Sequence, residues 1–161
     1  MSELHISHGS HSVAGPKPVN EDACGIHIPE APLLDGKGIA AVIADGMSGA
    51  VAGHEASQTS VTNFLSDYFS TSETWSVKKS AHTILTALNR WLYGQGHASY
   101  GTSKGLVCTF DAVIIKSTTA HIFHVGDSRV YLYRNNSLEC LTNDHQTHVG
   151  DRSFLSRAMG I

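Results

Sequence analysis

Acidic residues stand at three places where a predicted strand begins or ends: Glu21 and Asp22, then Asp45, then Asp127. Carboxylate oxygens are the ligands that Mg²⁺ and Mn²⁺ prefer, and these ions keep several waters beside a few carboxylates. Two such ions that share a carboxylate can activate water for in-line attack on phosphorus. If the fold brings the three places together, the sequence predicts a divalent-metal site suited to phosphate chemistry.

Each of these places, taken alone, also has an ordinary structural explanation. Glu21 and Asp22 fit a solvated loop, and Asp45 with Gly46 fits a common turn dipeptide. Asp127 fits the cap of a hairpin turn. The argument for a site therefore depends on all three places together rather than on any one of them.

Asp45 is the residue around which the rest is arranged, because it ends the continuous apolar run at 38–44. Such a run predicts a strand that is buried on both faces. Gly46 has no Cβ, so the backbone there can turn sharply and its carbonyl can approach a ligand. A helical pattern begins after Gly49.

The elements that must position these residues follow from periodicity. We predict strands at 4–13, 24–28, 38–45, 106–116, 119–125, 128–134 and 137–141, a loop at 29–36 and a short helix at 154–159. Apolar residues at helical spacing predict one helix around 61–68 and a second from 77, ended by Gly94 and Gly96. Ser117-Thr118 and Asn135-Asn136 are predicted to be tight turns. Strands, two consecutive helices and then strands indicate an α+β fold with largely antiparallel pairing.

Composition limits the classes of protein to which the chain can belong. Its 161 residues are 41% hydrophobic and 16% charged, which is typical of one soluble globular domain. No apolar run approaches the ~20 residues of a membrane span, and the first residues lack the features of a secretory signal. The net charge of −3 argues against a nucleic-acid partner. Three widely spaced cysteines predict a reduced, cytoplasmic chain with small buried thiols.

Three motifs of the chain resemble those of the metal-dependent protein serine/threonine phosphatases of type 2C, in the same order and at about the same spacing. They are Lys17-x-x-Asn20-Glu21-Asp22-Ala23, Ala44-Asp45-Gly46-Met47-x-Gly49-x-x-x-Gly53 and His124-Val125-Gly126-Asp127-Ser128-Arg129. Thr142-x-Asp144-His145 and Leu155-x-Arg157-Ala158-x-Gly160 resemble later segments of that family. The stretch from Asp67 to Gln95 further resembles a bacterial subgroup in which the phosphatase is fused to a C-terminal kinase.

The resemblance implies a sandwich of two antiparallel sheets with helices outside, of which residues 1–161 would be the N-terminal portion. It implies hydrolysis of phosphoserine and phosphothreonine in a phosphoprotein substrate by metal-activated water. Asp45 would bridge two Mg²⁺ or Mn²⁺ ions and the Gly46 carbonyl would bind one of them. Glu21 and Asp22 would belong to the same metal site, and Asp127 would hold a third, weaker ion. Lys17 would bind the substrate phosphate and, with Asp45, form the catalytic set.

The chain also departs from the pattern of the family. Lys17 stands where the family usually has Arg, and Lys offers phosphate a point charge instead of a bidentate fork. Ala50 stands where a His that could act as general acid is common, and His54, one helical turn on, is expected to be a helix surface residue. Two further aspartates are expected after Asp127, and neither Asp144 nor Asp151 fits them. We therefore expect a fold and a metal site that are incomplete at the C-terminus, and weak activity of this chain alone.

Two other functions fit parts of the pattern. A catalytically impaired module could keep the fold and only bind a phosphoprotein or another partner, which the missing aspartates favour. A nucleotide-binding domain is suggested by Gly46-x-x-Gly49-x-x-x-Gly53 between a strand and a helix. Two helices in succession argue against it, because a βαβ unit needs a parallel strand after one helix.

Overall fold

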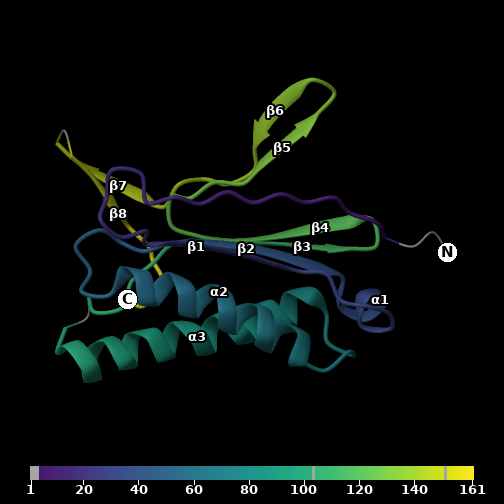
Figure 1. The fold of residues 1–161 in the computed structure, drawn as a ribbon, viewed down its shortest axis with the longest axis horizontal. Coiled ribbons are helices and arrows are strands. Elements are labelled where there is room, and N and C mark those ends of the chain that lie inside the picture. The colour runs from purple at the N-terminus through teal and green to yellow at the C-terminus, as the bar shows by residue number, and fades with distance from the viewer. Residues whose placement is uncertain (1–3, 103, 151) are drawn as a thin grey trace.

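The structure, a computed structural model, describes residues 4–102, 104–150 and 152–161. Its main sheet has four antiparallel strands in chain order: β1 (Asp22–His27), β2 (Ile39–Asp45), β3 (Phe110–Lys116) and β4 (Thr119–Val125) (Figure 1). The apolar run that ends at Asp45 is β2, which lies between β1 and β3. The α+β class and the antiparallel pairing are confirmed.

Two long helices, α2 (Gly53–Ser70) and α3 (Val77–Tyr100), cover one face of this sheet (Figure 1). Alternate residues of the central strands face the helices, as the period of two in a strand requires. The buried residues of this layer are Ala40, Val42, Ala44, Phe110, Ala112 and Ile114 from the sheet and Phe64, Tyr68, Leu88 and Leu92 from the helices. The core therefore lies between the sheet and the helix pair.

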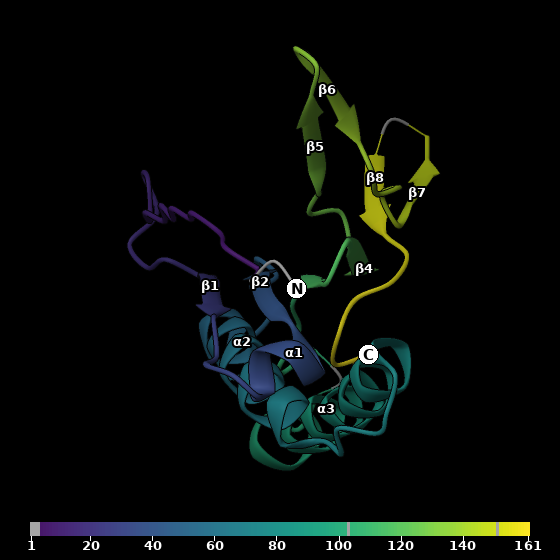
Figure 2. The same ribbon diagram turned by 90° about the vertical axis from the view of Figure 1, so that its right-hand side faces the viewer.

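Two hairpins stand on the side of the sheet away from the helices, as both ribbon views show (Figures 1 and 2). One is β5 (Tyr131–Arg134) with β6 (Ser137–Cys140), and the other is β7 (Gln146–Val149) with β8 (Arg152–Leu155). Residues 6–10 line a cavity of about 540 Å³ on this side of the sheet, together with residues of β1–β3 and 129–131. None of the helices in the described residues is long and apolar enough to cross a membrane.

Both predicted tight turns are present. Ser117 and Thr118 join β3 to β4, and Asn135 and Asn136 join β5 to β6. Both asparagines have positive φ, at 51° and 61°, which is the conformation that a two-residue hairpin turn requires.

Several predicted boundaries are wrong. Residues 4–13 form no strand. Apolar residues are few there, and residues 6–10 line the cavity instead of pairing with a strand. A five-residue helix, α1 (Leu33–Lys37), overlaps the predicted loop at 29–36 and ends one residue beyond it. Residues 154–159 are not a helix, since Leu155 ends β8 and Met159 exchanges backbone hydrogen bonds with Cys108. The strand predicted from 106 begins at Phe110.

The second long helix also continues past the glycines that were expected to end it. It runs to Tyr100, and Gly101 caps it in the left-handed conformation. Gly96 is instead a packing residue, because a Cβ there would lie 3.1 Å from the backbone nitrogen of Leu106. A glycine inside a helix can thus permit a close backbone approach as well as end the helix.

Candidate functional site

The ends of β1 and β2 bring the first two acidic places together. Asp22 and Asp45 are register partners in the antiparallel pair, so the two residues lie side by side at the ends of their strands. The pKa of Asp45 is raised from 3.8 to about 6, first by desolvation and then by the charge of Asp22 and the hydrogen bond with it. A carboxyl whose ionisation is disfavoured by a neighbouring carboxyl is a place at which a cation is stabilised.

The turn after β2 brings Glu21 to the same place. The Gly46 amide donates to the Glu21 carbonyl oxygen at 3.0 Å, and the Ser57 hydroxyl of α2 donates to that oxygen as well. A Cβ at Gly46 would lie 2.4 Å from the Gly53 backbone and 2.7 Å from the Glu21 carbonyl. Only glycine allows so close an approach, so the sequence Asp45-Gly46 fixes the start of α2 beside the carboxylates.

Lys17 lies at the mouth of this site. Its Nζ donates to the Ser48 hydroxyl at 3.0 Å and lies 3.5 Å from a carboxylate oxygen of Glu21. The side chain is 51% exposed, so it stays accessible to a ligand from solvent. Its positive charge acts to lower the pKa of Asp45, against the larger effects that raise it.

Thr109 connects Asp45 to the third acidic place. Its hydroxyl oxygen accepts from the Asp45 amide at 2.9 Å, and its own amide donates to the Asp45 carbonyl at 2.8 Å. The same hydroxyl shares a hydrogen bond of 2.7 Å with Ser128, the residue after Asp127. One buried side chain therefore ties the end of β2 to the turn after β4. Sequence reasoning did not single out Thr109, whose contacts lie 64 and 19 residues away.

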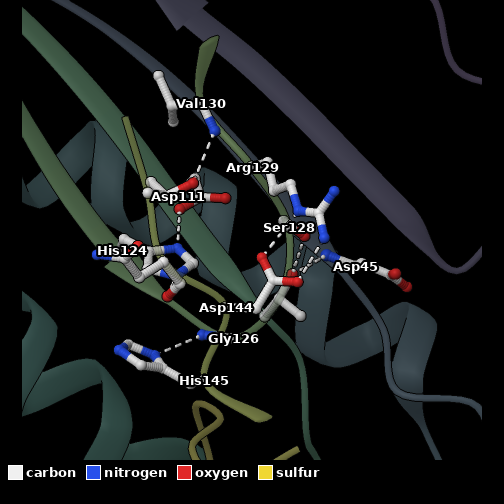
Figure 3. Close-up of polar contacts among 12 residues, drawn as sticks. Asp45, Asp111, His124, Gly126, Ser128, Arg129, Val130, Asp144 and His145 are labelled. Atoms are coloured by element: carbon white, nitrogen blue, oxygen red, sulfur yellow. Dashed lines mark hydrogen bonds and ion pairs between the residues drawn. The ribbon is translucent and has the colours of Figure 1, made fainter. Parts of the chain in front are cut away.

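Asp127 is held by a residue of the second hairpin. The Gln146 side-chain amide donates to its carboxylate at 2.9 Å. The charge of Asp127 also contributes, as the smallest effect that raises it, to the pKa of Asp45. Arg129 bonds Asp144 through two parallel contacts of 2.8 and 2.6 Å (Figure 3). Asp144 is thus engaged with Arg129.

A cavity of about 380 Å³ opens beside the paired carboxyls. It is lined by residues of the N-terminal segment, of both strand ends and of the turn after β4, namely His11, Ser12, Val13, Asp22, Ala23, Cys24, Ile43, Ala44, Asp45 and Ser128. Its mixed lining of carboxyl, hydroxyl and apolar groups can admit a small polar group such as a phosphate ester.

The donor set fits a hard divalent cation in part. The carboxyls of Asp22 and Asp45 lie at neighbouring strand ends, and carboxylate oxygens are the ligands that Mg²⁺ or Mn²⁺ takes. Within the described residues, however, no three His, Cys, Asp or Glu side chains gather closely enough to form a site by themselves. A carboxylate pair with carbonyl and water ligands is the arrangement that these residues can offer.

Other sequence expectations for the site have mixed outcomes. His54 is exposed on α2, as expected, and its Nδ1 lies 2.8 Å from the Asn20 carbonyl oxygen. Asp151 lies outside the described residues. All three cysteines are free, but only Cys108 is buried, so the prediction of buried thiols is wrong for Cys24 and Cys140. β2 and β3 are antiparallel, which removes the parallel unit that a nucleotide-binding interpretation needs.

Sequence reasoning also missed a hydrogen-bonded carboxyl–imidazole contact between β3 and β4. Asp111 is 2% exposed, and its Oδ1 lies 2.6 Å from His124 Nδ1 (Figure 3). Burial raises the pKa of Asp111, against the effect of His124. The signal was available, because the two-residue turn at Ser117 and Thr118 fixes a register in which Asp111 pairs with His124.

Comparison with known proteins gives consistent results. A family model described as protein phosphatase 2C matches residues 10–159. A protein of Streptococcus pyogenes serotype M6 named as protein phosphatase 2C-type is 33% identical over 112 residues, which are 68% of this chain and 45% of that protein. The serine/threonine phosphatase stp of Listeria welshimeri serovar 6b is 35% identical over 116 residues, which are 65% of this chain and 42% of that protein. The chain therefore spans less than half the length of these two relatives.

Solved structures show the same fold. The serine/threonine phosphatase Stp1 of Staphylococcus aureus superposes with a TM-score of 0.75 at 22% identity, over 99% of this chain and 70% of that one. The S. agalactiae serine/threonine phosphatase superposes with a TM-score of 0.66 at 29% identity, over 80% of this chain and 51% of that one.

Proposed function

The chain belongs to the protein phosphatase 2C family, and from that premise we propose that the whole protein hydrolyses phosphoserine and phosphothreonine in other proteins. The observation that carries the proposal is the carboxyl pair of Asp22 and Asp45 at neighbouring strand ends, with the pKa of Asp45 raised to about 6. Such a pair favours a divalent cation at neutral pH, and its cavity has room for a phosphate group.

The residues proposed to hold Mg²⁺ or Mn²⁺ are Asp45, Asp22, Glu21 and the carbonyl of Gly46, with Asp127 at a further, weaker site. A divalent ion bound there would supply Lewis acidity that activates water at neutral pH. Other residues of the chain would position these ligands. Thr109 fixes the backbone of Asp45, and Gln146 orients the carboxylate of Asp127.

Lys17 is proposed to bind the substrate phosphate. Its ammonium group is half exposed and is already directed to the site by Ser48 and Glu21. A phosphate oxygen that replaces the Ser48 contact would gain a charge-assisted hydrogen bond, which is roughly twice as strong as a neutral one.

Three further proposals concern the whole protein. The resemblance of 67–95 to phosphatases fused to a kinase leads us to propose a kinase domain as a partner in the same polypeptide. The free, exposed thiols of Cys24 and Cys140 support a reducing compartment, and we propose the cytoplasm. The substrate is proposed to be a phosphoprotein, with the peptide around the phosphate left undefined by the residues of this site.

The test is steady-state release of phosphate from a phosphothreonine peptide by the whole protein with saturating Mn²⁺. Lys17→Ala is expected to raise KM about tenfold with kcat nearly unchanged, because a lost contact of this kind is worth roughly 1.4 kcal/mol. Lys78→Ala, which removes an exposed lysine on α3, is the matched control. Peptide binding with no phosphate release would instead support the impaired binding module, and an unchanged KM would show that Lys17 is ordinary loop surface.

A further inference from the structure

The turn that carries Asp127 is bound along its length by one short segment, residues 143–146, which we call the strap. Each strap residue makes a contact with the region from His124 to Arg129. Asn143 offers its carbonyl to His124, Asp144 pairs with Arg129, His145 bonds Gly126, and Gln146 bonds Asp127. The position of Asp127 therefore depends on how firmly the strap is seated.

His145 fixes the strap to the turn through both its backbone and its ring. Its amide donates to the Gly126 carbonyl at 2.8 Å, and its Nδ1 accepts from the Gly126 amide at 3.1 Å. An acceptor nitrogen carries no proton, so the neutral ring with the proton on Nε2 is the form that fits. Desolvation, and then the charges of His124 and Arg157, lower the pKa of His145 in the same sense.

His124 anchors the strap from the sheet. Its Nε2 lies 3.0 Å from the Asn143 carbonyl oxygen, and a carbonyl can only accept, so Nε2 must carry a proton. Its Nδ1 lies 2.6 Å from Asp111 Oδ1, a short contact typical of a charge-assisted bond. The His124 ring also stacks on His145, with ring centroids 4.7 Å apart and planes at 26° (Figure 3).

Asp111 is the buried end of this chain of contacts. It is 2% exposed, and its Oδ2 has no hydrogen-bond partner among the described residues. A carboxylate with one unsatisfied oxygen in a buried place is costly, and a hydrophobic residue would suit the neighbouring apolar positions of β3 better. The carboxyl is therefore explained by its short hydrogen bond to His124, whose ring it orients.

We propose that Asp111 and His124 are positioning residues that seat the strap and thereby hold Asp127 in place beside Asp45. The link between Asp127 and a weaker metal site rests on the proposed function, whereas the seating of the strap does not. Neither Asp111 nor His124 touches a substrate or a proposed metal ligand directly. Both act through Asn143, His145 and Gln146.

The first test is made on the unaltered chain without metal, by nitrogen NMR of the histidine rings at pH 7. The expected result is a protonated Nε2 in His124, with its Nδ1 in a short hydrogen bond to Asp111, and an unprotonated Nδ1 in His145. A rapidly exchanging mixture of tautomers at either ring would overturn the proposal, because neither ring would then be held.

The second test compares Asp111→Asn, His124→Gln and the control His148→Gln, which alters an exposed histidine of β7. Amide hydrogen exchange at Gly126 and His145 is expected to accelerate at least about tenfold in the first two variants relative to the core amides of β2. The side-chain amide signals of Gln146 should lose the dispersion that a fixed bond to Asp127 gives. Equal acceleration at strap and core amides, or none in either variant, would overturn the positioning role.

Titration with Mn²⁺ separates this proposal from the proposed function. One outcome is that Asp45→Asn loses Mn²⁺ binding while amide hydrogen exchange of the strap is unchanged in His124→Gln. This outcome would overturn the positioning role and support the metal site. A loosened strap in His124→Gln together with full Mn²⁺ binding in Asp45→Asn would support the positioning role and overturn the metal site.

Discussion

The charged groups at the two ends of β2 have opposite surroundings: Lys37 is buried, whereas Asp45 is exposed. Just before the strand, the ammonium group of Lys37 is 1% exposed and donates to Thr71 Oγ1 at 2.6 Å, the Ser72 carbonyl at 2.7 Å and Ser80 Oγ at 3.1 Å. Its three donors are all used. At the other end, Asp45 is the register partner of Asp22, and desolvation together with the charge of Asp22 raises the pKa of Asp45 to about 6.

The difference separates a structural charge from a functional one. The Lys37 ammonium ties α1 to the segment between α2 and α3, and a ligand could add nothing to a group with three acceptors in place. The Asp45 carboxyl gains most from a cation that is not part of the chain. A strained electrostatic arrangement at a strand end is thus a better indicator of a binding site than a buried charge as such.

The largest expected effect comes from removing Lys37, whose ammonium group makes three hydrogen bonds. Lys37→Ala removes a buried side chain and leaves the Ser72 carbonyl without its donor, so the free energy of unfolding should fall by about 3 kcal/mol. Urea denaturation measures it, with Lys78→Ala on the exposed side of α3 as control. A loss in Lys37→Ala no greater than in the control would mean that the three hydrogen bonds contribute nothing net.

A smaller effect of opposite sign is expected at the other end. The folded-state pKa of Asp45, about 6, lies above its ordinary value of 3.8, so the contribution of this carboxyl to stability is fully present below pH 3.8 and is lost as the pH rises through about 6. Asp45→Asn removes this penalty and should stabilise the chain at pH 7 by roughly 1 kcal/mol, a value reduced by solvent screening. At pH 4 the two proteins should be nearly equal.

Urea denaturation at pH 4 and pH 7, with divalent ions removed by chelation, checks this second prediction. Asp67→Asn, at an exposed position on α2, removes the same charge away from the strand ends and serves as the control. A variant Asp45→Asn that is less stable than the parent at pH 7 would contradict the account of the carboxyl pair.

The parts of the fold that the sequence predicted are those that depend on local signals. The apolar run before Asp45 is β2, and the Asn135-Asn136 pair forms the predicted turn because asparagine tolerates positive φ. The predicted end of α3 was wrong because Gly96 does not end the helix. It allows the close approach of the Leu106 backbone, ten residues away in the sequence. Local propensity carries no information about such a contact.

The same division holds for the candidate site. The acidic residues and Gly46 could be proposed from residue type and position, and the structure pairs Asp22 with Asp45 and places the Glu21 backbone beside Gly46. The side chains that hold these acidic residues in place could not be predicted. Thr109 and Gln146 are ordinary polar residues in the sequence, and only the folded sheet and hairpins bring them to Asp45 and Asp127. Lys37 was missed for the same reason, since its partners lie 34 to 43 residues away.

The most direct test of the central claim, that the strand-end carboxyls form a divalent-cation site, is the affinity of the chain for Mn²⁺ measured by calorimetry at pH 7. The account predicts that Asp45→Asn weakens binding at least about tenfold, because it removes one of the two paired carboxylates. Asp67→Asn should change the affinity less than about twofold, since an exposed charge away from the site is screened. Equal affinities in Asp45→Asn and Asp67→Asn would contradict the claim.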